Sequence, residues 1–253
     1  MEFIRPEWSS PANVFALITT RSGGVSSAPY DSLNLGAHVG DSPERVAENR
    51  RLIHLHIPSE PIWLNQIHST LVSTPAQRIK PDGQPIVADA AITNKPNEVL
   101  AILTADCLPV LFSSRDGSVI GAAHAGWKGL CSGVLENTVS EILFANPHLS
   151  SSDLLAYLGP AIGPKVYEVG EDVYHSFKAS ACGIGKGDFQ EIPTKKGKYL
   201  ANLYSIAKNR LHTAGLIQVS GGTYCTFLDS SHFYSYRRDG VTGRFASLIW
   251  IAQ

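Results

Sequence analysis

One apolar stretch of the chain is interrupted at its middle: Val99-Leu100-Ala101-Ile102-Leu103-Thr104-Ala105-Asp106-Cys107-Leu108-Pro109-Val110-Leu111-Phe112. Its two halves, residues 99–103 and 108–112, have the length and the continuous hydrophobicity of strands that are buried on both faces. Asp106 stands out between them, because a carboxylate is almost never fully buried unless it is paired or functional. The stretch therefore predicts two buried strands separated by a short segment with a special role.

The following residues extend this pattern into a hairpin. Arg115-Asp116-Gly117-Ser118 has the composition of a turn, and residues 119–124 return as a strand, which would bring Cys107 and His124 near the same end. Further strands are expected at residues 14–20, 61–68, 154–158, 221–227 and 244–251, and helices at residues 42–56, 132–145, 171–179 and 202–213. This alternation predicts an α/β fold with mixed sheets, formed by residues 1–253 as a single domain.

Composition and charge exclude several classes of partner. The chain has 253 residues, of which 43% are hydrophobic and 17% charged, and its formal net charge is −1. So small a charge creates no general attraction for nucleic acid or an anionic membrane, so any anion must be bound locally. The first residues lack the apolar core of a secretory signal, and the longest apolar stretch is too short to span a bilayer. We expect a cytoplasmic monomer or small homo-oligomer.

The four cysteines do not form a disulfide framework. Cys107, Cys131, Cys182 and Cys225 are scattered along the chain without a regular spacing. This usage is typical of free thiols in a reducing compartment.

Cys107, His68 and His124 are candidate metal ligands, because each lies at the end of an apolar run and beside a turn. One sulfur and two imidazoles suit Zn²⁺, and three protein ligands would leave a fourth position open for water or substrate. Apart from Trp127 and Lys128, only small residues surround His124 between Ala122 and Gly129, which would allow backbone or a ligand to approach. The alternative is a packed cysteine and two hydrogen-bonded histidines, since no local pair such as CxxC or HExxH forces the three together.

A second group of candidates consists of arginines in glycine-containing loops. Arg237, Arg238 and Arg244 lie close together in the sequence, and Arg21 precedes Gly23-Gly24. A guanidinium group is permanently charged and presents forked donors, so it commonly clamps phosphate or carboxylate. The alternative is a solvated turn in which Asp239 neutralises one arginine.

Several motifs together resemble the YfiH-type family, whose members have been named laccase-domain purine nucleoside phosphorylases and, earlier, multicopper polyphenol oxidases. The motifs are Asn65-Gln66-Ile67-His68-Ser69, Thr104-Ala105-Asp106-Cys107-Leu108-Pro109, His124-Ala125-Gly126-Trp127, Gly159-Pro160-Ala161-Ile162-Gly163 and Tyr236-Arg237-Arg238-Asp239-Gly240-Val241-Thr242-Gly243-Arg244. The resemblance extends in the family's order from Arg21-Ser22-Gly23-Gly24-Val25-Ser26 to the C-terminus.

This resemblance implies a fold, a metal and a reaction. The implied fold is a single-domain sandwich of two mixed sheets flanked by helices, similar to the cytotoxic necrotizing factor cysteine hydrolases. The implied metal is zinc on His68, Cys107 and His124. The implied reactions are the phosphorolysis of adenosine, inosine and methylthioadenosine, and the deamination of adenosine.

The residues around the candidate metal ligands have expected roles. Arg21, Arg237, Arg238 and Arg244 would hold phosphate or substrate, and Asn34 and Gln66 would hydrogen-bond the base or the ribose. Asp106 would orient a ligand histidine or carry a proton. Copper fits the sequence less well, because a multicopper oxidase needs many histidine ligands, whereas the only HxH pair among the nine histidines is His54-Leu55-His56 on a predicted helix.

Two other functions stay open. In the first, Cys107 is the nucleophile and His124 the base of a cysteine hydrolase that cleaves an amide, such as a cell-wall precursor. In the second, the protein is a zinc- or purine-binding regulatory module without catalytic activity. Metal content and an assay with adenosine, with and without phosphate, separate these two functions from a zinc-dependent purine nucleoside phosphorylase.

Overall fold

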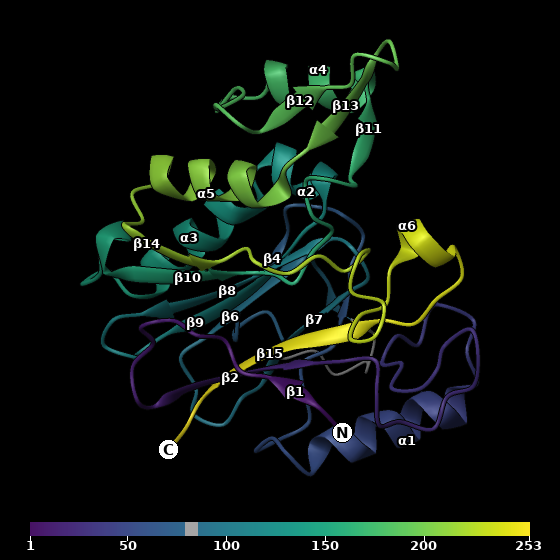
Figure 1. Cartoon of the computed structure of the whole chain (residues 1–253). Coiled ribbons are helices and arrows are strands. Elements are labelled where there is room, and N and C mark those ends of the chain that lie inside the picture. The colour runs from purple at the N-terminus through teal and green to yellow at the C-terminus, as the bar shows by residue number, and fades with distance from the viewer. Residues whose placement is uncertain (79–85) are drawn as a thin grey trace.

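The structure, a computed structural model, describes residues 1–78 and 86–253. Two β-sheets are stacked on one another and helices cover the outer face of each, as Figure 1 shows from α1 (Pro43–His54) at the bottom to α3 (Val134–Ala145) and α5 (Leu203–Thr213) above the sheets. The predicted α/β sandwich of two sheets flanked by helices is confirmed.

The two sheets differ in strand direction. The four-stranded sheet is antiparallel throughout and has the order β1 (Phe3–Ile4), β2 (Val14–Thr19), β15 (Phe245–Ile251), β7 (Leu100–Thr104). The six-stranded sheet is mixed and has the order β14 (Gln218–Gly221), β10 (Leu154–Leu158), β8 (Leu108–Ser114), β9 (Ile120–Ala125), β6 (Ala90–Thr93), β4 (Val72–Ser73).

The interrupted apolar stretch passes from one sheet to the other. Its first half forms β7 at the edge of the four-stranded sheet, and its second half forms β8 inside the six-stranded sheet. The turn between them falls at Asp106, whose φ of 94° is uncommon for a residue other than glycine. The special segment predicted from the sequence is therefore the point at which the chain changes sheets.

Both halves of this stretch are buried on both faces because a layer of side chains lies on each side of each sheet. Successive residues of a strand point to opposite faces. In β7, Leu100 and Ile102 pack into the core between the sheets, whereas Ala101 and Leu103 pack toward Ile53 of α1. In β8 and β9, alternate residues pack between the sheets or against α3 and α5.

The helix predicted at residues 132–145 is confirmed as α3, but a short helix that was not predicted precedes it. α2 (Trp127–Ser132) ends and α3 begins at Gly133, whose φ of 102° lies in the left-handed region that favours glycine. The amide of Gly133 donates to the carbonyl oxygens of Gly129 and Leu130, which closes the first helix. The other helix predictions hold to within a few residues, and Ser42 and Asn202 cap α1 and α5 with their side chains as N-cap residues commonly do.

Two strand predictions are largely wrong. Within residues 61–68 the only strand is β3 (Leu64–Asn65), which pairs with β5 (Ile86–Val87), and Ile62 makes an isolated bridge to Leu100. The chain then turns at His68, whose φ is 61°. Within residues 221–227 the strand is already ending, since β14 ends at Gly221, and Gly221 and Gly222 both have positive φ. Periodicity did not reveal either turn.

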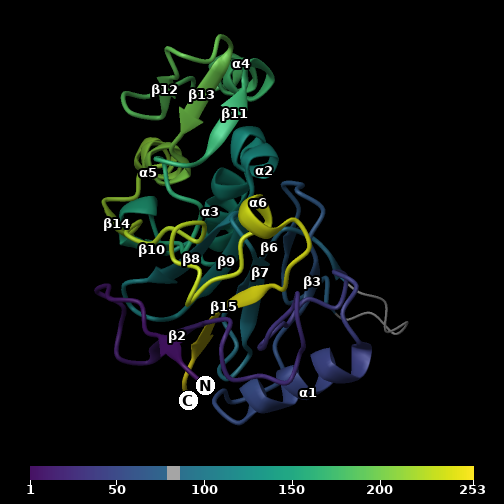
Figure 2. The same cartoon turned by 45° about the vertical axis from the view of Figure 1, so that its right-hand side comes forward.

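A smaller sheet lies far from α1. It consists of β11 (Glu168–Gly170), β13 (Lys198–Ala201) and β12 (Phe189–Glu191), and α4 (Glu171–Ala179) packs beside it (Figure 2). The short helix α6 (Tyr236–Asp239) lies between this sheet and the four-stranded sheet in both views. None of the helices within residues 1–78 and 86–253 has both the length and the apolar character that a membrane crossing requires.

The central position of β8 leads to a prediction about stability. Phe112 is 0% exposed in the core beneath α3, so replacing it with alanine should lower the free energy of unfolding by about 3–5 kcal/mol. Phe144 lies in α3 and is 84% exposed, so Phe144→Ala should change it by only about 0.5 kcal/mol. Urea unfolding of both variants measures the two values, and equal losses would contradict the layered core.

Candidate functional site

Three potential metal ligands meet where the two sheets come together. Cys107 lies in the turn between β7 and β8, His124 lies in β9, and His68 follows β3. Because Pro109 pairs with His124 in the β8–β9 ladder, Cys107 lies beside His124. One ligand atom from each side chain lies within 4.8 Å of the other two, and Cys107 Sγ is 3.7 Å from His68 Nε2. In the part of the chain that the structure describes, no other three His, Cys, Asp or Glu side chains gather in this way.

The backbone at Gly126 leaves room for His68 and Cys107 to approach each other. A Cβ atom on Gly126 would lie 2.6 Å from His68 Cδ2 and 3.1 Å from Cys107 Sγ, and the first distance is shorter than real Cβ contacts allow. Only glycine at this position lets the imidazole and the thiol approach each other. The sequence predicted that small residues near His124 would allow a close approach, and Gly126 is the residue that allows it.

Asp89 holds the two histidine segments together, and sequence reasoning missed it. Its Oδ1 lies 2.8 Å from His124 Nδ1 and accepts a hydrogen bond from the His68 amide at 2.9 Å. Its Oδ2 accepts from the amides of Ile67 and Ser69 and from the Ser69 hydroxyl. The sequence contains a signal for it, because Asp89 is a lone carboxylate within the apolar residues 86–92, as Asp106 is within residues 99–112.

The protonation of the cluster follows from these contacts. Burial alone would raise the pKa of the Cys107 thiol, but the charge and hydrogen bonds of His124 and His68 bring it down to about 6. Burial alone would lower the pKa of His124, but the Cys107 thiolate and Asp89 raise it to about 9. Burial would likewise raise the pKa of Asp89, but hydrogen bonds from His124 and Ser69 lower it to about 2. Near neutral pH the metal-free cluster is therefore a thiolate beside an imidazolium, held by a carboxylate.

The cluster opens into a cavity of about 390 Å³. Besides the three candidate ligands, its lining includes His38, Gln66, Thr104, Tyr236 and Arg244. Desolvation and the charges of Arg244 and Arg50 lower the pKa of His38, so that its ring is neutral at pH 7. A cavity of this size can enclose most of a small organic ligand.

Arg244 is the arginine of this cavity, and Asn34 holds it in place. Asn34 is buried and accepts a hydrogen bond from the Arg244 amide at 2.9 Å, while its own amide group donates to Asp41 and Gly36. One guanidinium nitrogen of Arg244 donates to the carbonyl oxygens of Thr242 and Gly243. Burial lowers the pKa of Arg244, but a guanidinium group remains protonated in proteins.

Gln66 lines the same cavity with an amide that is already paired. Its Nε2 donates to the Leu103 carbonyl at 2.8 Å and its Oε1 accepts from the Leu103 amide at 2.9 Å. This pair of bonds fastens the segment before His68 to the end of β7.

A second cavity, of about 170 Å³, lies on the other side of Cys107 and contains Arg237. The Asp106 carboxylate accepts hydrogen bonds from the Thr226 hydroxyl at 2.7 Å and from the Arg237 amide at 2.6 Å. The Arg237 guanidinium lies 5.2 Å from the centre of the Tyr167 ring and donates through Nη1 to the Glu168 carbonyl.

Two of the predicted arginines lie elsewhere. Arg21 donates to Asp31 and to the Ser230 carbonyl, and Arg238 donates to the carbonyl oxygens of Thr226, Phe227 and Phe233 and to Asp239. Neither of these two arginines lines either cavity. Their donors are directed at the protein's own carbonyl oxygens and carboxylates.

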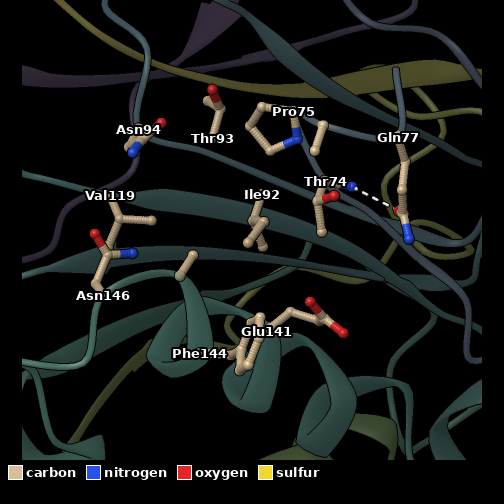
Figure 3. Close-up of a pocket in the computed structure, with 12 residues that line it drawn as sticks. Thr74, Pro75, Gln77, Ile92, Thr93, Asn94, Val119, Glu141, Phe144 and Asn146 are labelled. Atoms are coloured by element: carbon tan, nitrogen blue, oxygen red, sulfur yellow. Dashed lines mark hydrogen bonds between the residues drawn. The ribbon is translucent and has the colours of Figure 1, made fainter. Parts of the chain in front are cut away.

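A larger cavity, of about 640 Å³, lies between β6 and the end of α3. Figure 3 shows its lining, which combines apolar side chains such as Ile92 and Phe144 with Glu141 and several amides. It contains none of the predicted site residues and no histidine or cysteine among its lining. Size alone therefore does not identify the candidate site.

The lowered thiol pKa can be tested directly. After removal of metal with a chelator, the ultraviolet absorbance of the Cys107 thiolate should appear as the pH rises through about 6. His124→Asn should move this midpoint upward, because it removes the positive charge that stabilises the thiolate. Cys107→Ser should lack the transition altogether. A wild-type midpoint at the ordinary cysteine value of about 8.5 would contradict the described geometry.

Comparison with known proteins places this site in a family. A family profile described as "Multi-copper polyphenol oxidoreductase laccase" matches residues 15–252. The chain is 48% identical to "Purine nucleoside phosphorylase YfiH" of Escherichia coli (strain K12) and to "Purine nucleoside phosphorylase" of Haemophilus influenzae, with 99% of each chain covered. A crystal structure of a Neisseria meningitidis protein matches over 100% of both chains with 45% identity and a TM-score of 0.92. The chain therefore belongs to the YfiH-type family, to which the laccase description refers.

Proposed function

We propose that the protein is a zinc-dependent purine nucleoside phosphorylase that acts on adenosine, inosine and methylthioadenosine and also deaminates adenosine. The observation that carries the proposal is the group of His68, Cys107 and His124 at the wall of a cavity that also contains Arg244. The printed names of the relatives support an enzyme of this kind.

The donor set favours zinc over copper. Two imidazoles and one thiolate suit a tetrahedral zinc site with one open position. Zinc bound by these residues would supply Lewis-acid polarisation and activation of water. A multicopper oxidase needs several groups of histidine ligands, whereas residues 1–78 and 86–253 contain one three-donor cluster.

We propose that two arginines hold phosphate. Arg244 lines the larger of the two cavities beside Cys107 and Arg237 lines the smaller one, and both cavities share Cys107 and Tyr236. Phosphate bound here would attack the anomeric carbon, so that a carbon–oxygen bond forms as the bond from ribose to the purine nitrogen breaks. The guanidinium groups would balance the charge of the phosphate in this confined space.

The remaining predicted residues position these groups. Asp106 holds the Arg237 segment, Asn34 holds the Arg244 backbone, and Gln66 holds the His68 segment against β7. Arg21 and Arg238 stabilise loops by donating guanidinium hydrogen bonds to backbone carbonyl oxygens. The exposed ring of Tyr236 lies in both cavities, so we propose that it stacks on the purine base.

The thiols and the charge support a cytoplasmic setting. All four cysteines are free, which supports a reducing compartment such as the cytoplasm. We propose that residues 1–253 act as one catalytic unit, as a monomer or small homo-oligomer, on small molecules and not on nucleic acid.

One alternative is favoured by a specific observation. Cys107, His124 and Asp89 are arranged as a nucleophile, a base and an orienting carboxylate, which is the arrangement of a cysteine hydrolase. Such an enzyme would cleave an amide through Cys107 without metal, whereas a cysteine bound to zinc is not a free nucleophile. A purely zinc- or purine-binding module would keep the ligands but show no turnover.

The reaction provides the main test. Zinc-loaded protein should convert adenosine and phosphate to adenine and ribose 1-phosphate, and adenosine and water to inosine and ammonia. Release of adenine should require phosphate, whereas formation of inosine should persist without it, because only the first reaction uses phosphate as nucleophile. Chromatography of the products measures both, with Cys107→Ser as the inactive control. Cleavage of an amide by metal-free protein, with adenosine left intact, would instead establish the cysteine hydrolase.

The phosphate assignment predicts different effects for different arginines. Arg237→Ala and Arg244→Ala should each raise the KM for phosphate about ten- to a hundredfold, which corresponds to the loss of one or two hydrogen bonds to a charged group. Lys196→Ala, a change in an exposed loop, should leave this KM unchanged. Arg238→Ala should lower the thermal stability more than it affects the KM for phosphate, because its donors hold backbone carbonyls. Equal KM effects from all four changes would indicate a general charge effect.

A further inference from the structure

The buried carboxylate of Asp89 contacts two of the three candidate metal ligands, His124 and His68. It is 0% exposed, and its Oδ1 contacts both histidines of the cluster, the ring of His124 and the backbone amide of His68. A buried carboxylate is costly unless its oxygens are satisfied, and here backbone amides, a hydroxyl and an imidazole satisfy them. The question is what this arrangement does beyond satisfying the charge.

The contact with His124 determines which nitrogen of that ring is free. A carboxylate oxygen only accepts, so the Nδ1 atom 2.8 Å away must donate and carry the proton. In the neutral ring the lone pair is then on Nε2, the other ring nitrogen. A metal ligand needs this lone pair, and such an outer contact commonly fixes it.

The contacts with residues 67–69 determine where His68 lies. The amides of three successive residues, Ile67, His68 and Ser69, converge on the two oxygens of Asp89. They hold a turn in which His68 has a φ of 61°, an uncommon conformation for this residue. The Asp89 backbone adds a further link, because its carbonyl accepts from the His124 amide at 2.6 Å.

We propose that Asp89 is the positioning residue of the metal site: it fixes the tautomer of His124 and the backbone turn of His68, and so sets the affinity for zinc. This inference rests on the proposed zinc site. Asp89 is not itself a ligand, because its oxygens are occupied by the histidine segments.

Replacing Asp89 with asparagine keeps the shape of the side chain but removes its charge and one of its two acceptor oxygens. Asparagine has one acceptor oxygen, so one side of the group must present an N–H donor. If the donor faces His124, Nδ1 can no longer donate and the lone pair needed for zinc is lost from Nε2. If the donor faces residues 67–69, it opposes the amides of Ile67 and Ser69 and the turn at His68 is disturbed. Either orientation weakens the metal site.

Asp188 is a matched control. It is also buried, and its carboxylate accepts hydrogen bonds from the Gly185 amide, the Ser205 hydroxyl and the Asn209 amide group. None of these partners belongs to the cluster. Asp188→Asn should therefore lower stability without changing zinc binding.

The test is the zinc dissociation constant of the full chain, measured by competition with a chromophoric chelator. Asp89→Asn should raise this constant about ten- to a hundredfold, and Asp188→Asn should leave it unchanged. Asp89→Asn binding zinc as tightly as wild type would overturn the inference. Wild-type protein that binds no zinc would instead count against the proposed function.

A second measurement needs no variant and covers the case in which Asp89→Asn does not fold. In zinc-loaded wild-type protein, nitrogen-resolved NMR of the histidine rings should show a proton on Nδ1 of His124. A proton on Nε2, with Nδ1 bound to zinc, would overturn the inference, because Nδ1 could not then donate to Asp89.

Discussion

The hydrogen bonds that Asp106 accepts from Thr226 and Arg237 hold the chain where it passes from the four-stranded to the six-stranded sheet. At this point an apolar strand must leave one layer and enter the next without exposing its side chains to water. The turn costs backbone strain at Asp106, whose φ is positive, and the two hydrogen bonds offset that strain. Cys107 follows directly, so the same turn that joins the sheets also delivers the thiol to the cavity.

The candidate site depends on two carboxylates that do similar work at opposite sides of Cys107. Asp106 fixes the segment that carries Arg237, and Asp89 fixes the segments that carry His68 and His124. Each accepts hydrogen bonds from backbone amides and thereby positions other side chains. Neither needs to touch a substrate to matter, and rigid support of this kind is what a site with a defined geometry requires.

The arginines illustrate how one chemistry serves two purposes. Arg238 directs its donors at the carbonyls of three residues, and Arg21 at a neighbouring loop, so both spend their hydrogen-bonding capacity on the fold. Arg237 donates to one carbonyl and Arg244 to two, each through a single guanidinium nitrogen, and both arginines line cavities beside Cys107. All four arginines lie in similar glycine-containing segments, so their local sequence does not separate the two roles.

The sequence by itself determined the α/β class, most of the helices, and the residue types of a candidate metal site, and its resemblance to a family added the sandwich of two sheets. Hydrophobic periodicity and end signals are local properties, so they predicted β7, β8, β9 and α5 well. The register of the hairpin also followed from a short turn, which is why Cys107 and His124 were expected to lie together. Only the tertiary structure brought His68 to them, gave Asp89 its contacts and separated the arginines that line the cavities from those that bond to the fold. Those outcomes depend on which backbone groups, distant in sequence, converge on one side chain, and no local pattern records that convergence.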